Sequence, residues 1–334
     1  MRVNPAPKLT PHLVARGAIA DDFFLVDVGA SGGIEAYWRV FGNSLRAVGF
    51  DPLVKEVERL NHEERSPRVR YYAALVGYRR YAELLPKHPV PNNDAYWRSS
   101  SVRVQERLTC SYAETYFDRT HDGTRSAELI ELDEYFFQPS QDSVDFIKID
   151  TDSHDYEVLL GAKDLLTRSP VMGLLVEAPF QGPDHEAATL FSNIDVFLRK
   201  LGFSLFEFDP RWYSRAALPK RFRWMQPADT VEGQLVWADC LYLRDAGIEG
   251  YEQTWNLTLS PAKLLKLCCL YELFSLQDCA AETLLKYRDR LADRLDLDAC
   301  LNLLTPPLPD GRQVSYREYN DFFDQNVEAF YPER

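Results

Sequence analysis

Three turns in this sequence combine acidic residues with positions that could bind a ligand, and each turn follows an apolar run. They are Asp27-Val28-Gly29-Ala30-Ser31-Gly32-Gly33, Phe50-Asp51-Pro52, and the stretch from Lys148 to Asp155. Glycines in a turn let backbone N–H groups approach a ligand closely. An acid at the end of the next strand can accept two hydrogen bonds from a ribose diol. The order strand, glycine turn, helix, strand and acid therefore predicts a nucleotide-shaped site in an open α/β sheet.

The spacing of the glycine turn indicates which nucleotide would fit. The turn reads G-x-x-G-G, whereas a dinucleotide fingerprint requires G-x-G-x-x-G, and no G-x-x-x-x-G-K-S/T phosphate loop is present in the sequence. An acid before the first glycine suits S-adenosylmethionine, because a carboxylate offsets the positive charge of its α-amino group. The residues expected to contact this cofactor here are Asp27, Gly29, Ala30, Ser31, Gly32 and Gly33. A tight strand-to-helix turn without a ligand is the alternative.

Asp51 and Pro52 close the second apolar run, where a ribose would lie. The Asp51 carboxylate can accept the two hydroxyl hydrogen bonds, and it can also cap the following helix through Pro52, a favourable first-turn residue. The two roles are compatible. We expect Asp51 and Pro52 to belong to the cofactor site, and Ala74 and Leu75, at the end of the third strand, to flank the adenine.

The third turn holds several groups that could move a proton. Asp150, Asp152 and His154 follow a buried strand and precede a helix. Ligands of open α/β sheets bind beyond the carboxyl ends of the strands, so Asp150 or His154 could take a proton from an acceptor hydroxyl. Asp150 and Asp152 could also hold a divalent cation, although none is predicted. The alternatives are helix capping by Asp152 or Ser153, an interaction of Asp155 with the positive helix end, and a positioning or surface role for His154.

Seven apolar runs provide the strands that would position these turns. They span residues 23–28, 45–50, 69–76, 144–149, 171–177, 203–208 and 234–243. Helical patterns lie near residues 34–41, 53–61, 156–166 and 186–201. Little alternation within the first runs indicates strands buried on both faces, and no long helix separates the last two. We therefore predict an α/β fold with a doubly wound, mostly parallel seven-stranded sheet that ends in an antiparallel pair, as in class I methyltransferases.

The chain is expected to divide into two parts. Residues 1–250 would form the S-adenosylmethionine-binding domain, with the proline-rich insertion 78–127 as an acceptor-site lid. Residues 256–334 have helical patterns and would form a C-terminal helical appendage, through which a homodimer is possible.

The composition is typical of a soluble globular protein and limits the partners. The 334 residues carry a net charge of −13, which argues against a nucleic-acid substrate and against a stable resting place on anionic lipid. The six cysteines form no C-x-x-C pair, so neither a zinc site nor a disulfide framework is expected. We see no signal peptide, and the longest apolar stretch, residues 264–276, is too short to be a transmembrane segment. A reducing cytoplasm is the expected location.

At the three turns the chain resembles the FkbM-type methyltransferases, a family of S-adenosylmethionine-dependent O-methyltransferases. The resemblance covers about residues 20–245 and rests on Asp27-Val28-Gly29-Ala30, Asp51-Pro52, the run from Lys148 to Asp155, and Gly161-Ala162. Weaker similarities are Ser99-Ser100-Ser101, Leu132-Asp133-Glu134-Tyr135 and Val176-Glu177. Asp152 and Asp155 stand where glutamates are usual, and Ser153 replaces the usual glycine. The acceptor or the geometry of the base is therefore expected to differ from the family norm.

The resemblance implies transfer of a methyl group to a hydroxyl of a small-molecule or glycan acceptor, such as a sugar, a glycolipid headgroup or a polyketide-like molecule. A nicotinamide-dependent oxidoreductase or epimerase is disfavoured by the glycine spacing and by the lack of a Tyr-x-x-x-Lys pair in the expected helix. A binding module that kept the fold and lost turnover is a third possibility, motivated by Asp152, Ser153 and the helical tail.

Overall fold

The computed structural model describes residues 1–19, 21–108, 127–136, 143–152, 154–225 and 227–332. The chain forms two compact units. The first contains Met1, residues 24–34 and residues 46–245, and the second contains residues 2–23, 35–45 and 246–334. The second unit is therefore assembled from three separate stretches of the sequence. The predicted division at residues 250–256 stays a prediction.

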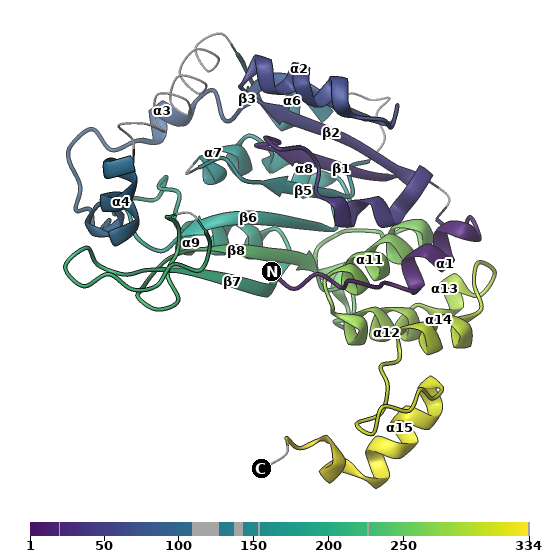
Figure 1. Cartoon of the computed structure of the whole chain (residues 1–334). Coiled ribbons are helices and arrows are strands. Elements are labelled where there is room, and N and C mark those ends of the chain that lie inside the picture. The colour runs from purple at the N-terminus through teal and green to yellow at the C-terminus, as the bar shows by residue number, and fades with distance from the viewer. Residues whose placement is uncertain (20, 109–126, 137–142, 153, 226, 333–334) are drawn as a thin grey trace. The chain divides into compact units, whose positions relative to one another are not determined.

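An eight-stranded sheet forms in the order β4-β3-β2-β1-β5-β6-β8-β7 (Figure 1). The strands are β1 (Phe23–Val28), β2 (Leu45–Asp51), β3 (Val69–Val76), β4 (Glu128–Ile130), β5 (Phe146–Ile149), β6 (Gly173–Pro179), β7 (Phe203–Tyr213) and β8 (Gln234–Arg244). All seven predicted strands are present. The sequence did not predict β4, because three residues at a sheet edge are too few to give a recognisable pattern.

The pairing of the strands confirms a mostly parallel sheet that ends in an antiparallel pair. β1 pairs with β5, β5 with β6, and β2 with β3, all in parallel, whereas β8 is antiparallel to both β6 and β7. The register places Val28 opposite Ile149, and Ile149 opposite Val176. The carboxyl ends of β1, β5 and β6 therefore lie side by side, which is where an open α/β sheet binds its ligands.

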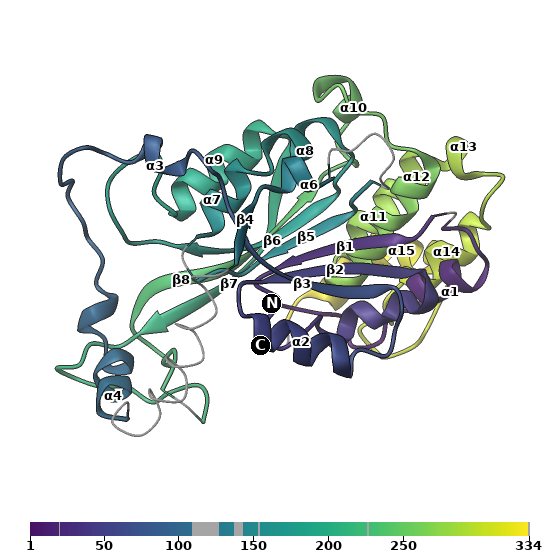
Figure 2. The ribbon, with the colours of Figure 1, turned by 90° about the horizontal axis from the view of Figure 1, so that it is seen from above.

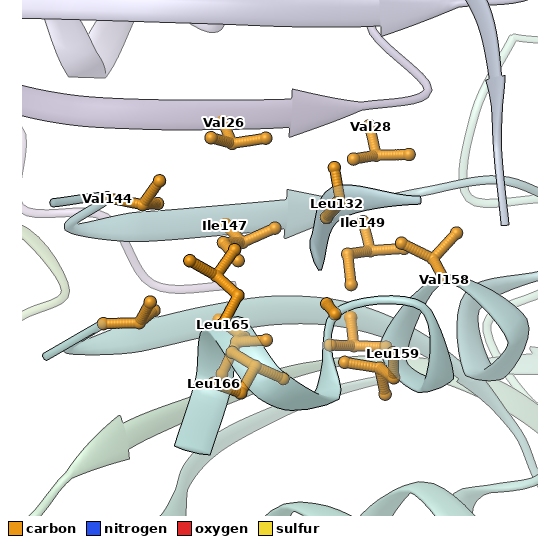
Figure 3. Close-up of a cluster of buried hydrophobic side chains, with 14 of the residues drawn as sticks. Val26, Val28, Leu132, Val144, Ile147, Ile149, Val158, Leu159, Leu165 and Leu166 are labelled. Carbon is orange, nitrogen blue, oxygen red and sulfur yellow. The ribbon is translucent and has the colours of Figure 1, made fainter. Parts of the chain in front are cut away.

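Helices cover both faces of this sheet. Four helices, α6 (Leu132–Phe136), α7 (Asp155–Leu160), α8 (Lys163–Arg168) and α9 (Phe191–Lys200), bury their apolar residues in one cluster with the strands. Figure 3 shows Val26, Val28, Ile147 and Ile149 of β1 and β5 beside Val158, Leu159, Leu165 and Leu166 of α7 and α8. The helix α2 (Val54–Glu63) lies on the opposite face (Figure 2). This arrangement confirms the doubly wound fold class.

Two predicted helices differ from expectation. The pattern at residues 34–41 forms the 3₁₀ helix η1 (Ala36–Ser44), which is kinked at Gly42, where φ is 53°. The pattern at 156–166 is split into α7 and α8 between Gly161 and Ala162. Asp133 causes part of this break, because its carboxylate accepts hydrogen bonds from the N–H groups of Asp164 and Leu165 at 2.9 and 2.7 Å and so starts a new helix.

Part of the predicted lid falls outside the described residues, since 109–126 are not among them. The described part contains α3 (Tyr81–Leu84), the 3₁₀ helix η2 (Tyr96–Arg98) and α4 (Ser100–Leu108). Ser100 at the start of α4 is buried, and its hydroxyl lies 2.7 Å from that of Ser214 in the connection between β7 and β8. This contact ties the segment after β3 to the antiparallel pair.

The second unit is helical. Its elements are α1 (Leu9–Ala15), η1, α10 (Tyr251–Thr254), α11 (Pro261–Leu273), α12 (Gln277–Lys286), α13 (Arg288–Leu291), α14 (Leu297–Leu304), α15 (Tyr316–Gln325) and the 3₁₀ helix η3 (Val327–Phe330). Helix α11 is buried all round, and its Glu272 carboxylate accepts the N–H groups of Lys8, Leu9 and Thr10 at 2.6–2.7 Å. A residue of α11 therefore caps the start of α1. No helix in the described part of the chain has the length and apolar character needed to cross a bilayer.

Candidate functional site

The three turns singled out in the sequence meet at the carboxyl edge of the sheet. The N–H groups of Gly29 and Ala30 donate to the carbonyl of Phe50 at 2.9 and 3.0 Å, and the N–H of Asp150 donates to the carbonyl of Val28 at 2.9 Å. The glycine turn is thus bonded on one side to the end of β2 and on the other to the residue after β5. The convergence expected for Gly32, Asp51 and Asp150 is present in the fold.

Gly29 occupies a position that no other residue fits. Its φ is 81°, and a Cβ atom placed there would lie 1.8 Å from the carbonyl oxygen of Asp150. Gly32 also has a positive φ, of 84°, but no atom lies within 4 Å of its Cβ position. The N–H of Gly32 donates to Glu56 Oε1 at 2.9 Å. The turn is therefore packed tightly against β5 at its start and has open space beside Gly32, which is the arrangement that a bound ligand requires.

Asp51 is buried beside this turn at the end of β2. Its Oδ1 accepts the N–H of Leu53 at 2.8 Å, and Ser31 provides a second backbone donor to the carboxylate. Burial raises the pKa of Asp51, whereas these N–H donors act in the opposite direction. Helix α2 has no side-chain cap at its N-terminus. Asp51 therefore orders the turn that contains Pro52 without capping α2 itself, and its role as ribose acceptor stays a prediction.

The two predicted adenine neighbours lie next to Asp51 on β3. Ala73 is the register partner of Asp51, so Ala74 and Leu75 extend one and two residues beyond it toward the carboxyl edge. The Ala74 side chain is buried in the apolar cluster, whereas Leu75 is exposed. Of the two side chains, only that of Leu75 is accessible to a ligand.

Lys148 connects the glycine turn to the third turn. Its Nζ lies 3.3 Å from Asp27 Oδ1 and 3.3 Å from Asp150 Oδ2. Asp27 and Lys148 are opposite one another in the register of β1 and β5, and both are buried. The sequence assigned no separate role to Lys148, although a lysine inside a buried strand is itself a signal, because such a charge needs a partner.

Four acids form a carboxylate cluster, which we define as Asp150 directly after β5, Asp155 at the start of α7, Glu177 on β6 and Asp239 on β8. Glu177 and Asp239 are register partners on β6 and β8. Burial and the neighbouring carboxylates raise the pKa of Glu177 to about 9 and that of Asp155 to about 7. Burial also raises the pKa of Asp239 to about 6, although Arg211, whose Nη2 lies 2.8 Å from Asp239 Oδ2, opposes this shift. Perturbed carboxylates at a sheet edge indicate a functional site.

The sequence did not identify Asp239 and named Glu177 only as a weak similarity to the FkbM-type proteins. Asp239 stands inside the apolar run of β8, between Ala238 and Cys240. An acid within such a run is the signal that could have found it, since a buried charge is retained only with a partner or a function.

The other two predicted catalytic residues lie beside this cluster. Asp152 has a φ of 50°, and burial followed by the charge of Asp150 raises its pKa. His154 immediately precedes α7, its side chain is 63% exposed, and its Nδ1 lies 3.4 Å from Glu157 Oε2. The hydrogen bond to Glu157 is the main cause that raises the pKa of His154. Ser153, between them, lies outside the described residues.

The described residues contain no group of three or more histidines, cysteines, aspartates and glutamates arranged to hold a metal ion. The pair Asp150 and Asp152, considered above as a cation site, is therefore joined by no third ligand of these types in that part of the chain.

Comparison with known proteins identifies the family. The model of the methyltransferase FkbM domain matches residues 27–205, which is more than half of the chain and includes all three turns. None of the curated proteins compared matches the chain.

Several solved methyltransferase structures resemble the fold at low identity. A TehB-like S-adenosylmethionine-dependent methyltransferase from Corynebacterium glutamicum has a TM-score of 0.29 and 11% identity, with 71% of this chain and 87% of that chain covered. A candidate RNA methyltransferase from Pyrococcus horikoshii has a TM-score of 0.30 and 9% identity, with 73% and 92% covered. The S-adenosylmethionine-dependent methyltransferase SibL, in its apo form, has a TM-score of 0.27 and 13% identity, with 70% and 54% covered.

These structural likenesses are too weak to carry a substrate or a mechanism to this chain. The match to the family model is sufficient by itself to identify the family. It argues against the alternative prediction that the chain is a nicotinamide-dependent oxidoreductase. The chain belongs to the FkbM family and is an S-adenosylmethionine-dependent methyltransferase.

Proposed function

We propose that this methyltransferase transfers the methyl group to a hydroxyl oxygen of a sugar, a glycolipid headgroup or a polyketide-like molecule. The observation that carries the proposal is the carboxylate cluster. Methyl transfer to a hydroxyl releases the hydroxyl proton, so the reaction is favoured by a carboxylate that can accept this proton at neutral pH. Asp155 and Asp239, with pKa values of about 7 and about 6, lie in the range where carboxylates exchange protons under such conditions.

We assign the cofactor to the first two turns, at the carboxyl ends of β1 and β2. The backbone of residues 29–33 would hold its methionyl end, Asp27 with Lys148 would set the charge beneath it, and Asp51 would accept the ribose hydroxyls. Leu75, with the backbone of Ala74, would flank the adenine. When bound, the cofactor supplies a methyl group activated by a positively charged sulfur. The residues of the chain then need only align the hydroxyl with that methyl group and accept its proton.

Asp150 is the proposed base. Its side chain is 52% exposed and its Oδ2 contacts Lys148 Nζ, so it lies between solvent and the residues that hold the glycine turn. Asp155, Glu177 and Asp239 are less exposed than Asp150, so Asp150 is the member of the carboxylate cluster that an acceptor could reach most easily. Asp152 and His154, in the turn between β5 and α7, would position the acceptor beside the carboxylate cluster. The exposed ring of His154 and its contact with Glu157 favour this role over that of the base.

The proposal is tested by incubating the protein with methyl-labelled cofactor and fractionated cell extract, followed by mass spectrometry of the product that gains a methyl group. We expect an O-methylated product. Asp150→Asn should lower kcat by about 10²–10⁴-fold and leave the affinity for the cofactor nearly unchanged, while Asp164→Asn on the exposed face of α8 should change neither. A product methylated only on nitrogen or carbon would refute the proposed acceptor class, and a full loss in His154→Gln with an active Asp150→Asn would move the base to His154.

A location in the cytoplasm and a dimer formed through residues 256–334 belong to the same proposal. Analytical ultracentrifugation of the full chain and of Phe323→Ser, an exposed position on α15, tests the dimer.

A further inference from the structure

The connection between β7 and β8 exposes large apolar side chains. In residues 214–233, Leu218 is 70% exposed, Trp224 is 59% exposed and Met225 is fully exposed. Trp97 of the neighbouring 3₁₀ helix η2 is 72% exposed. Single exposed apolar residues are common on proteins, but four large ones on two adjoining loops are not, and such a group marks an interaction surface.

Basic residues surround these four side chains. They are Arg98 and Arg103 on the first segment, and Lys220, Arg221 and Arg223 on the second. We call the nine residues together the hairpin patch. The two acids of residues 214–233 are already paired, because Asp229 is buried 2.9 Å from Arg223 and Glu232 lies 3.6 Å from Lys220. These pairs offset two of the five basic residues, and the hairpin patch keeps a net positive charge on a chain whose net charge is −13.

The hairpin patch is built on a defined backbone. Phe222 and Thr230 form an isolated β-bridge, and the N–H of Arg223 donates to the carbonyl of Asp229 at 3.0 Å. Trp224 and Met225 thus lie at the turn of a small hairpin. The two sides of this hairpin are joined by backbone hydrogen bonds. The backbone therefore holds Trp224 and Met225 in exposed positions.

The two segments of the hairpin patch are also bonded to each other. The N–H of Ala216 donates to the carbonyl of Arg98 at 3.0 Å, and Arg103 Nη1 donates to the carbonyl of Ala216 at 3.2 Å. Trp97 and Leu218 therefore belong to one continuous surface. Both views of the ribbon place the connection between β7 and β8 beside α4 (Figures 1 and 2).

The hairpin patch extends toward Asp152 and the carboxylate cluster, the side of the proposed site that we call the acceptor entrance. Tyr96, next to Trp97, and Tyr213, at the end of β7, have ring centroids 5.3 Å apart. The charge of Asp152 acts on Tyr96, whose pKa burial raises to about 12, and the charge of Glu177 acts on Tyr213. The pair of tyrosines thus lies between the carboxylate cluster and the exposed tryptophan.

We propose that the hairpin patch docks this protein on the surface of an anionic lipid bilayer. Tryptophan at the tip of a loop favours the headgroup region, and the aliphatic Leu218 and Met225 side chains would enter the boundary with the acyl chains. The surrounding lysine and arginines would contact lipid phosphates. Nucleic acid is the less favoured partner, because Leu218 and Met225 offer no surface on which bases stack.

This surface refines what the composition predicted. A net charge of −13 argues against binding to anionic lipid only if the charge is spread evenly. At physiological salt the Debye length is about 8 Å, so a cationic surface contacting the bilayer is screened from acids elsewhere on the chain. One further step rests on the proposed function: docking at the acceptor entrance favours the glycolipid headgroup among the three acceptor classes.

The test is sedimentation of the full chain with vesicles, without cofactor or acceptor, so that its outcome does not depend on catalysis. Vesicles of phosphatidylcholine are compared with vesicles that also contain phosphatidylglycerol. We expect binding only to the anionic vesicles, and its loss when salt is raised from about 0.05 to about 0.5 M. Arg221→Glu should weaken binding by at least about fivefold, the contribution of one cation near such a surface. The double variant Trp224→Ser/Met225→Ser should weaken it by about tenfold or more.

Matched controls lie on the second unit. Trp255→Ser removes another exposed tryptophan and Arg288→Glu reverses another exposed arginine, and both should bind vesicles as the unmodified chain does. The proposal is overturned if no vesicles sediment the protein, if the control variants lose binding equally, or if a single-stranded oligonucleotide binds more tightly than the anionic vesicles. Failure to methylate any lipid would leave docking intact and would count only against the glycolipid step.

Discussion

The carbonyl oxygen of Asp150 lies 1.8 Å from the place where a Cβ atom on Gly29 would stand. The glycine turn proposed to bind the cofactor and the turn that carries the proposed base are thus in direct backbone contact. The hydrogen bond from the Asp150 N–H to Val28 fixes the same two turns from the other side. The proposed cofactor and acceptor sites would therefore be held at one distance by main-chain atoms, which side-chain substitutions on the surface would not change.

Gly29→Ala should both destabilise the protein and abolish cofactor binding. A left-handed φ costs an alanine about 1–2 kcal/mol, and the clash with Asp150 adds backbone strain, so we expect a loss of about 3–4 kcal/mol. Gly17→Ala is the matched control, since Gly17 has a φ of 64° with no atom near its Cβ position. It should lose only about 1–2 kcal/mol. Denaturant unfolding and calorimetry with the demethylated cofactor measure both effects, and equal losses in the two variants would contradict the close contact.

Asp51→Asn should weaken cofactor binding by about 10–100-fold, because hydrogen bonds to a charged acceptor contribute about 1.5–3 kcal/mol. The amide oxygen keeps the contact with the Leu53 N–H, so the fold should be retained. Glu58→Gln, an exposed acid on α2, is the control and should bind the cofactor normally. Calorimetric titration gives the dissociation constants. An unchanged affinity of Asp51→Asn for the cofactor would contradict the proposal that the ribose binds at the carboxyl end of β2.

Lys148→Met should be strongly destabilising, by about 3 kcal/mol or more, because it leaves the buried Asp27 carboxylate without this cation. The double variant Lys148→Met/Asp27→Asn should recover much of that loss, since both members of the buried ion pair are then neutral. Unfolding free energies of the four proteins give the coupling energy. Additive losses would show that the 3.3 Å contact contributes nothing to the fold.

The stability of the protein should fall as pH rises. The pKa of Glu177 is raised to about 9 and that of Asp155 to about 7, so the folded chain holds these protons more tightly than the unfolded chain. Stability from them is complete below the ordinary carboxyl pKa and is lost as pH rises through the raised values, at up to about 1.4 kcal/mol per pH unit for each group.

Between pH 7 and pH 9 the fall should depend mainly on Glu177. Glu177→Gln should therefore flatten the curve in that interval, whereas Asp289→Asn, on an exposed side chain of α13, should not. The free energy of unfolding of both variants and of the unmodified chain, measured at several pH values between 7 and 9, tests this prediction. A curve for Glu177→Gln that is as steep as that of the unmodified chain would contradict the buried, protonated state.

The strands could be predicted from the sequence because their apolar runs are long and sharply ended. β1 and β3 have the predicted bounds, and the other predicted strands differ by one to five residues at one end or both. Helix boundaries were less certain, since they depend on contacts distant in the sequence. Nothing near Gly161 reveals that Asp133 will start α8, or that a Cβ on Gly161 would lie 2.1 Å from the carbonyl of Gly77.

The candidate site could be predicted in part for the same reason. Asp51 and Asp150 follow strands directly, so a parallel sheet brings them together whatever the loops do. Asp239 could not be placed beside them, because that requires the register of the antiparallel pair, in which it faces Glu177. The ion pair between Lys148 and Asp27 likewise follows from the register of β1 and β5, which the sequence does not give.

Glu272 has a consequence for how the chain can be dissected. Its carboxylate holds the backbone at the start of α1, although more than 260 positions separate the two in sequence. Phe23, Trp38 and Phe41 form a stacked aromatic group within the same unit, and Trp38 also meets Phe274. A truncation near residue 250 would therefore leave α1 without the carboxylate of Glu272 and would expose the face of Trp38 that contacts Phe274. Residues 2–23 and 35–45 therefore depend on residues 246–334 for their packing, and the protein should be expressed as the whole chain.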